Sequence, residues 1–209
     1  MNKELETVWS NAMIENKEKN LESISGVGST LGYTETLRSE LPTLIKKFSI
    51  SSMFDAPCGD MNWMSVFLKE NNIDYVGGDI VKHVVEDNQK YANDQTKIIH
   101  IDITSSNFPN ADLWLCRDCW FHLPDAHIFA SIDNFLKSNI KYLLTTTHIN
   151  TGFDNQNLEQ VGFKLIDLFK PPYNFPKPLY KIVDYRGKKF PREMVLFSRD
   201  QLIEWKRSQ

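Results

Sequence analysis

Four aspartates each come at the end of a segment that is expected to form a buried strand: Asp55, Asp79, Asp102 and Asp118. Parallel strands bring their carboxyl ends to one edge of a sheet, and open α/β folds bind ligands at that edge. There, Asp79 can accept hydrogen bonds from ribose hydroxyls, and Asp102 can accept one from the exocyclic amine of adenine. Each acid alone can also be an ordinary helix N-cap. As a set, Asp55, Asp79 and Asp102 favour a nucleoside-like ligand.

The turn after the first of these strands is the most informative stretch. In FDAPCGDMNWM (residues 54–64) an apolar strand end is followed by a tight turn and an amphipathic helix start. Such a turn directs backbone N–H groups and the positive end of a helix dipole at one point, which suits an anionic or hydrogen-bond-accepting ligand. Only Gly59 remains of the three glycines of a dinucleotide fingerprint, which disfavours a nicotinamide cofactor. An ordinary strand–helix turn is the alternative.

Two histidines and one aspartate near the ends of the fourth and fifth predicted strands are candidates for a general base. These are His122, His148 and Asp118. An imidazole with a pKa near neutrality suits proton removal from a weakly acidic hydroxyl. Either histidine can instead be a packed structural residue. A divalent cation held by Asp118, His122 and Asn150 is disfavoured because no dense set of carboxylates accompanies them, so no metal is expected.

The polar, proline-bearing segment 149–178 is too long for a simple connection and is expected to form much of an acceptor site. Tyr173 and Phe175 can stack on a sugar face or a nucleotide base, or can simply pack within the loop. A group of cations toward the C-terminus can meet a diphosphate or form a solvated turn: Lys177, Lys188, Lys189 and Arg192.

Strand–helix alternation must position these residues. Near-continuous apolar strands separated by helices predict a parallel sheet that is covered on both faces. The expected strands are 50–55, 75–79, 97–101, 111–117, 142–147, 179–184 and 193–197. The expected helices are 3–18, one around Leu37 that ends before Pro42, another that begins at Pro42, then 62–70, 81–91, one from Pro124 and one from Asp200. The loop SGVGST (residues 25–30) is either a plain connection or a segment that closes over a ligand.

Composition limits the classes of protein that remain. The 209 residues suit one domain, in which 1–49 forms a helical cap, 50–147 a cofactor-binding core, 149–178 an insertion, and 179–209 the last strands and helix. A net charge of −3 gives no general attraction to nucleic acid or anionic membranes. No apolar run is long enough to span a membrane, and the N-terminus lacks the apolar core of a signal peptide. Three cysteines fit a reduced, cytoplasmic setting.

The order of motifs resembles that of class I S-adenosylmethionine-dependent methyltransferases across residues 50–147. FDAPCGD stands at the place of the first motif, YVGGDI of the second, HIDIT of the third and ADLWLCRDCWFHLPD of the fourth. The flanking SGVGSTLGYTETLRSELP and YLLTTTH resemble a narrower group, the small bacterial methyltransferases of surface-polysaccharide gene clusters, including capsular heptose O-methyltransferases. Pro57 and Cys58 stand where the broad family has glycine, a departure that the narrower group shares.

This resemblance implies a Rossmann-like α/β fold with seven strands, mostly parallel with an antiparallel last strand, and helices on both faces. It also implies S-adenosylmethionine as the cofactor. The residues that it places against the cofactor are Ser25, Gly26, Arg38, Asp55, Gly59, Asp79, Ile80, Asp102 and Ile103. Asp79 and Ile80 belong to ribose and adenine in this reading, and Arg38 either pairs with the methionine carboxylate or is a surface arginine.

The sequence therefore predicts an enzyme that methylates a hydroxyl of a sugar, expected to be a nucleotide-activated or capsular heptose. A methyltransferase of another small acceptor, such as a phosphoramidate or a natural product, is one alternative, and a non-catalytic nucleotide-binding partner protein is another. Nucleic-acid methylation is disfavoured. The sequence Pro171-Pro172-Tyr173 falls far from the end of the fourth strand, where amino-group nucleic-acid methyltransferases carry a similar motif.

Overall fold

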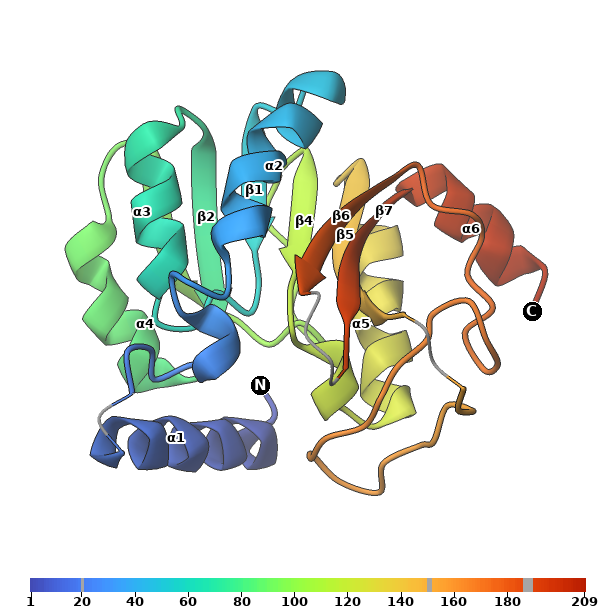
Figure 1. The fold of residues 1–209 in the computed structure, drawn as a ribbon, viewed down its shortest axis with the longest axis horizontal. Coiled ribbons are helices and arrows are strands. Elements are labelled where there is room, and N and C mark those ends of the chain that lie inside the picture. Colours follow the sequence, from blue (N-terminus) through green and yellow to red (C-terminus); the bar gives the residue numbers. More distant parts are fainter. Residues whose placement is uncertain (20, 150–151, 186–189) are drawn as a thin grey trace.

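A seven-stranded sheet in the order β3-β2-β1-β4-β5-β7-β6 forms the centre of the computed structural model, which describes residues 1–19, 21–149, 152–185 and 190–209 (Figure 1). The strands are β1 (Ser52–Asp55), β2 (Asp74–Asp79), β3 (Thr96–His100), β4 (Leu113–Cys116), β5 (Tyr142–His148), β6 (Tyr180–Tyr185) and β7 (Arg192–Ser198). Strands β1 to β5 pair in parallel, whereas β7 is antiparallel to both β5 and β6. The predicted Rossmann-like fold, mostly parallel with an antiparallel last strand, is confirmed.

Helices cover both faces of the sheet. They are α1 (Lys3–Glu18), α2 (Glu35–Lys47), α3 (Asn62–Glu70), α4 (Lys82–Asn88), α5 (Asp125–Lys137) and α6 (Arg199–Arg207), with the short 3-10 turns η1 (Val27–Ser29), η2 (Gln89–Tyr91) and η3 (Trp120–His122). Side chains alternate between the two faces of a strand. Met53 therefore packs in the core beneath α2 and α3, and its neighbour Phe54 packs in the core beneath α5 and α6.

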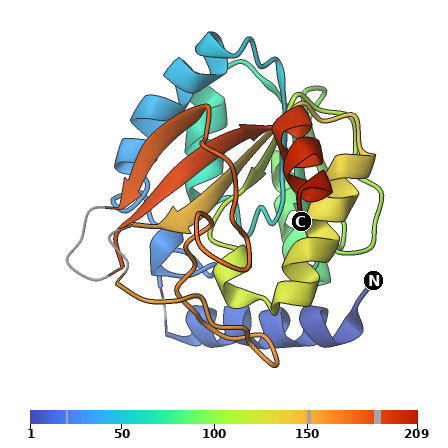
Figure 2. The ribbon, with the colours of Figure 1, turned by 90° about the vertical axis from the view of Figure 1, so that its right-hand side faces the viewer.

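Helix α1 lies across the carboxyl ends of the parallel strands, at one end of the sheet (Figures 1 and 2). The Asn2 side chain caps it by accepting the backbone N–H groups of Glu4 and Leu5. Its apolar face turns inward, with Leu5 and Met13 buried. An amphipathic helix in this position covers the edge at which ligands bind in open α/β sheets.

The predicted break at Pro42 is wrong, because α2 runs through this residue as one helix. Proline cannot donate a backbone hydrogen bond and is unfavourable in a helix interior. The inner face of α2 carries three fully buried leucines, and their packing in the core stabilises the helix. These are Leu37, Leu41 and Leu44. Tertiary burial outweighs the local preference of the proline here. The predicted helix 81–91 is also divided, since α4 ends at Asn88 and η2 follows.

The segment 152–178 contains no helix or strand among its described residues. It extends beyond the carboxyl ends of the strands to the level of α1 (Figures 1 and 2). Its apolar side chains join the core beneath α5 and α6 at Ile166, Leu168, Tyr173 and Phe175. The insertion is thus packed against the sheet. None of the helices in the described part of the chain is long and apolar enough to cross a lipid bilayer.

Candidate active site

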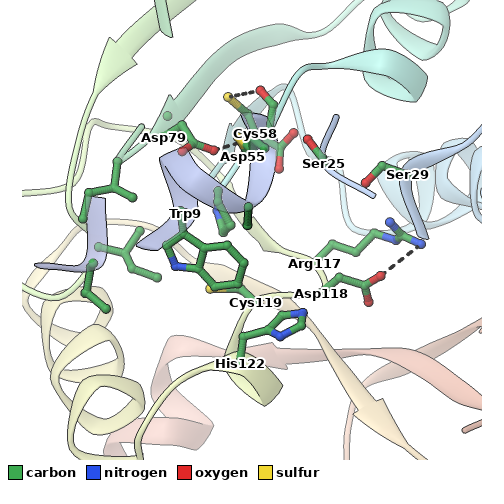
Figure 3. A pocket seen from close by; sticks show the side chains of 18 of the residues that line it. Trp9, Ser25, Ser29, Asp55, Cys58, Asp79, Arg117, Asp118, Cys119 and His122 are labelled. Carbon is green, nitrogen blue, oxygen red and sulfur yellow. Dashed lines mark hydrogen bonds and ion pairs between the residues drawn. The ribbon is translucent and has the colours of Figure 1, made fainter. Parts of the chain in front are cut away.

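A pocket of about 160 Å³ lies at the carboxyl edge of β1, β2, β3 and β4, beneath α1 (Figure 3). Many of the predicted site residues line it: Ser25, Asp55, Gly59, Asp79, Ile80, Asp102, Ile103, Asp118 and His122. Figure 3 shows Asp55 and Asp79 on one side of the pocket and Asp118 and His122 on the other. The pocket therefore brings the strand-end acids and one candidate base to a common space.

The turn between β1 and α3 requires glycine at position 59. Gly59 has a φ of +55°, and a Cβ atom there would lie 2.2 Å from the Ser25 hydroxyl oxygen. That hydroxyl accepts the backbone N–H of Asp60 at 2.9 Å and donates to the Asp60 carboxylate at 3.1 Å. The loop that carries Ser25 is consequently fixed against the turn, and both segments form one wall of the pocket.

Asp79 holds the turn from the next strand. One carboxylate oxygen accepts the N–H of Gly59 and the other accepts the N–H of Val81, each at 2.9 Å. Asp55 accepts the hydroxyl of Tyr75 at 2.8 Å. Burial raises the pKa of Asp79, and it raises the pKa of Asp55 to about 7 despite the Tyr75 hydrogen bond. Asp55 therefore changes its charge near neutral pH.

Asp102 is fully engaged by donors. One oxygen accepts the N–H and hydroxyl of Thr104, at 2.9 and 2.6 Å. The other accepts the N–H of Asn2 at 2.8 Å and the hydroxyl of Ser105 at 2.9 Å. Burial favours the neutral acid, but these donors outweigh it and lower the pKa of Asp102. Because Asn2 caps α1, this contact ties the helix to the pocket.

His122 is held in a tautomer that allows Nε2 to act as a base. Its Nδ1 lies 2.7 Å from the carbonyl oxygen of Gly162, which can only accept a hydrogen bond. The imidazole therefore donates through Nδ1, and Nε2 carries the lone pair. Burial lowers the pKa of His122 below its usual value, which favours the neutral ring. Trp9 of α1 meets the imidazole edge-on, with the ring centroids 5.2 Å apart.

Asp118 is paired and is a poor candidate for a free base. Its carboxylate accepts Nη2 of Arg192 at 2.6 Å and the hydroxyl of Thr146 at 3.3 Å. The residue has a φ of +50°, a left-handed conformation at the end of β4. Asn150, the third residue of the cation site considered with Asp118 and His122, lies outside the described residues.

The remaining predicted residues lie away from the pocket lining. Arg38 donates hydrogen bonds to the Leu31 carbonyl at 2.9 Å and to the Thr34 hydroxyl at 3.3 Å, so its side chain stabilises the start of its own helix, α2. Gly26 adopts a φ of +101° in the preceding loop. His148 is 1 % exposed and accepts the N–H of Ile166 at Nδ1.

The aromatic residues expected to stack on a substrate are part of the core. Tyr173 is fully buried and Phe175 is 5 % exposed. The Tyr173 hydroxyl donates to Asp125, and the Trp205 indole donates to the Tyr173 carbonyl. Contrary to the expectation, both rings pack against the sheet and offer no face to a ligand, which corresponds to the loop-packing alternative. Lys188 and Lys189 lie outside the described residues.

Arg117 and Trp9 are among the pocket residues to which the sequence assigned no role. Arg117 bonds the Gly28 carbonyl at 2.8 Å and pairs with Asp184 at 3.1 Å. Its position directly after β4 and before Asp118 was the available signal, because strand ends meet the ligand edge. Trp9 belonged to an apolar helix face, and that periodicity alone does not distinguish a pocket lining from an ordinary core.

No family model matches the sequence, and no curated protein matches it. Solved structures do. A SAM-dependent methyltransferase from Leishmania major has a TM-score of 0.63, at 15 % identity over 90 % of this chain and 83 % of its own. The methyltransferase domain of a bacterial Hen1 protein has a TM-score of 0.60, at 13 % identity over 79 % of this chain and 98 % of its own. Magnesium protoporphyrin IX methyltransferase from Synechocystis, solved with bound SAM, has a TM-score of 0.58, at 11 % identity over 92 % of this chain and 94 % of its own.

The chain has the Rossmann-like fold of these solved methyltransferases. Its pocket occupies the carboxyl edge of the parallel strands, which is where open α/β sheets bind their ligands. The fold and the position of the pocket thus agree with the order of motifs in the sequence.

Proposed function

We propose that the protein is an S-adenosylmethionine-dependent O-methyltransferase. The observation that carries the proposal is a single pocket that joins Asp55, Asp79 and Asp102 to the unprotonated Nε2 of His122. The three carboxyl groups suit a nucleoside with an amino-acid tail. The lone pair of His122 Nε2 suits the removal of a proton from the acceptor. The methyltransferase fold supports the same assignment, as does a structural neighbour that was solved with SAM bound.

The residues present fit this cofactor. The Asp79 carboxylate accepts backbone N–H groups of Gly59, Val81 and Ile80, which leaves about one of its roughly four acceptor positions for a ribose hydroxyl. Ile80 and Ile103 supply apolar walls for a flat base. Asp55 is placed for the ammonium group. We assign the methionine carboxylate to Arg117, which lines the pocket, in place of Arg38, which does not.

The chain's own part in the reaction is alignment and proton removal. When bound, the cofactor supplies an electrophilic methyl group on a sulfonium. His122 Nε2 would take the proton of the acceptor hydroxyl, so that the hydroxyl oxygen could receive the methyl group that the cofactor would supply. The carbonyl of Gly162 holds the imidazole in the required tautomer. Correct alignment of the two reactants can remove roughly 7–11 kcal/mol of the barrier at most.

We propose a sugar hydroxyl as the acceptor, on a nucleotide-activated or capsular heptose. The support is the likeness of residues 25–42 and 142–148 to methyltransferases of surface-polysaccharide clusters. Fold does not determine substrate, so the acceptor is to be decided by experiment. A panel of nucleotide-linked heptoses, free sugars, phosphoramidates and phenolic natural products separates this acceptor from the other small molecules considered.

Calorimetric titration with S-adenosylhomocysteine, with NADH as a control, tests the cofactor assignment. Selective binding of S-adenosylhomocysteine is expected, and Asp79→Ala is expected to abolish it. Binding of NADH, or full binding by the Asp79→Ala variant, would contradict the proposal. Binding without turnover on any acceptor of the panel would instead favour a non-catalytic partner protein.

A further inference from the structure

Two exposed aromatic rings lie outside the pocket lining, Phe163 beside His122 and Phe190 beside Phe163. Phe163 is 50 % exposed and Phe190 is 45 % exposed, and their ring centroids are 5.6 Å apart. The Phe163 ring lies 5.9 Å from the imidazole of His122. Phe190 has a φ of +56°, which bulky residues rarely adopt and which is concentrated at functional sites. Such a surface next to a base suits a flat ligand ring.

The insertion holds His122 and His148 in opposite tautomers. The Gly162 carbonyl accepts a hydrogen bond from His122 Nδ1 at 2.7 Å, which leaves Nε2 without a proton. The Ile166 N–H is donated to His148 Nδ1 at 3.1 Å, so the neutral His148 ring carries its proton on Nε2. Burial lowers the pKa of both rings, to about 4 for His148. One imidazole is thus a base and the other is a hydrogen-bond donor.

The donor of His148 is unused in the free protein. The residue is 1 % exposed, and its Nε2 has no hydrogen-bond partner among the described residues. Aromatic rings lie around the imidazole, with centroid distances of 5.3 Å to Phe121, 6.4 Å to Phe163 and 6.5 Å to Phe190. Buried donors are nearly always paired, and an unpaired one calls for an explanation. A ligand oxygen would satisfy it.

We propose that Phe163, Phe190 and His148 form the acceptor subsite, and that it binds a ring that carries a second oxygen besides the hydroxyl to be methylated. The hydroxyl gives its proton to His122, and the second oxygen accepts the N–H of His148. Phe163, the more exposed of the two rings, lies 5.9 Å from the imidazole of His122 and 6.4 Å from that of His148, so one small ring packed on Phe163 would lie near both. The half-exposed phenylalanines turn aside to admit the oxygen and pack on the flat face of the ring. This proposal rests on the proposed methyl transfer for the role of His122.

Nitrogen-15 NMR of the histidine-labelled protein tests the subsite directly. We expect an unprotonated Nε2 in His122 and a protonated Nε2 in His148. trans-1,2-Cyclohexanediol and catechol serve as ring probes with two oxygens, and cyclohexanol is the matched probe with one. At least one two-oxygen probe should shift the His148 N–H resonance, and cyclohexanol should leave it in place. The same tautomer in both rings, or no shift with either two-oxygen probe, overturns the proposal.

Kinetics with the best acceptor from the panel provide the second test. Phe163→Ala should raise KM about tenfold or more, because the ring face is lost, while kcat stays within about threefold. Phe169→Ala is the control, since Phe169 is also exposed, at 37 %, and lies against Lys181 instead of His122. Equal effects of the two substitutions would overturn the subsite.

His148 variants test the second oxygen. His148→Ala should raise KM about tenfold for the acceptor but not for its analogue that lacks the second oxygen. His148→Gln retains an amide donor and should recover part of the loss. Equal KM values of the wild type for the acceptor and for the analogue that lacks the second oxygen would refute the inference. If the wild-type protein does not bind S-adenosylhomocysteine, the proposed function is refuted instead. The NMR result would still decide whether the subsite exists.

Discussion

His122 is the residue on which turnover is expected to depend. Its Nε2 is free to accept a proton because Nδ1 is committed to the Gly162 carbonyl. His122→Ala should lower kcat by roughly 10²–10⁴ and leave S-adenosylhomocysteine affinity nearly unchanged, since the imidazole acts on the acceptor. The rate of product formation with the best acceptor measures kcat, and calorimetry measures the affinity for S-adenosylhomocysteine. His83→Ala on α4 is the control and should retain full activity. A His122→Ala variant as active as that control would exclude this base.

Asp55 should couple cofactor binding to pH. Its buried carboxyl has a pKa raised to about 7, so the free protein holds it neutral below that pH. In the proposed complex, the cofactor's ammonium would pair with the ionised form of Asp55 alone. Affinity for S-adenosylhomocysteine is therefore expected to fall as the pH decreases through about 7, and binding below that pH should release a proton.

Calorimetry between about pH 5.5 and 8.5, in buffers of different ionisation enthalpy, measures both the affinity and the released proton. Asp55→Asn keeps an oxygen for the Tyr75 hydroxyl but cannot ionise. This variant should bind more weakly and lose the pH dependence. If it keeps the wild-type dependence on pH, another group is responsible, and the ammonium does not pair with Asp55.

At the scale of elements, we expect α1 to compete with the cofactor for Asp102. A carboxylate has about four acceptor positions, and donors of Thr104, Ser105 and Asn2 fill them. An adenine amine can bond Asp102 only when the Asn2 N–H withdraws. Asn2→Pro removes that N–H and should therefore speed S-adenosylhomocysteine association and tighten its binding by about tenfold or less.

The matched control is Asn2→Ala, which loses the helix cap but keeps the backbone N–H. Stopped-flow fluorescence of Trp9 can follow association, since this indole lines the pocket. Equal rates for the Pro and Ala variants would mean that the backbone contact does not limit entry, and that any change comes from the lost cap.

Local pattern predicted the elements well and failed where long-range packing decided. The acids that line the pocket were found because each follows a buried strand, and strand ends meet at one edge. Pro42 was misplaced because the burial of Leu41 and its neighbours is a tertiary effect. Tyr173 was assigned to a ligand because a polar loop does not show which of its rings enters the core. Arg117 was overlooked because its partner Asp184 lies far along the chain.

At the scale of the whole molecule, Asp184 joins segments that are distant in sequence. Its fully buried carboxylate pairs with Arg117 at 3.1 Å and with Arg192 at 3.4 Å. Arg192 in turn pairs with Asp118, and Arg117 reaches the carbonyl of Gly28. This network connects the ends of β4, β6 and β7 to the loop before α2. The pocket wall and the antiparallel part of the sheet are thereby held as one unit.

Asp184→Asn is expected to lower the free energy of unfolding by about 3–5 kcal/mol, because it leaves two buried guanidinium groups with too little negative charge. Glu193→Gln is the control on the neighbouring strand. Its pair with Lys181, at 2.9 Å, has a half-exposed ammonium, and its loss should cost about 1 kcal/mol or less. Urea unfolding of both variants measures the difference. The Asp184→Asn variant should also bind S-adenosylhomocysteine more weakly, since Arg117 loses its anchor. Similar small losses in both variants would show that the buried network does not hold the two parts of the sheet together.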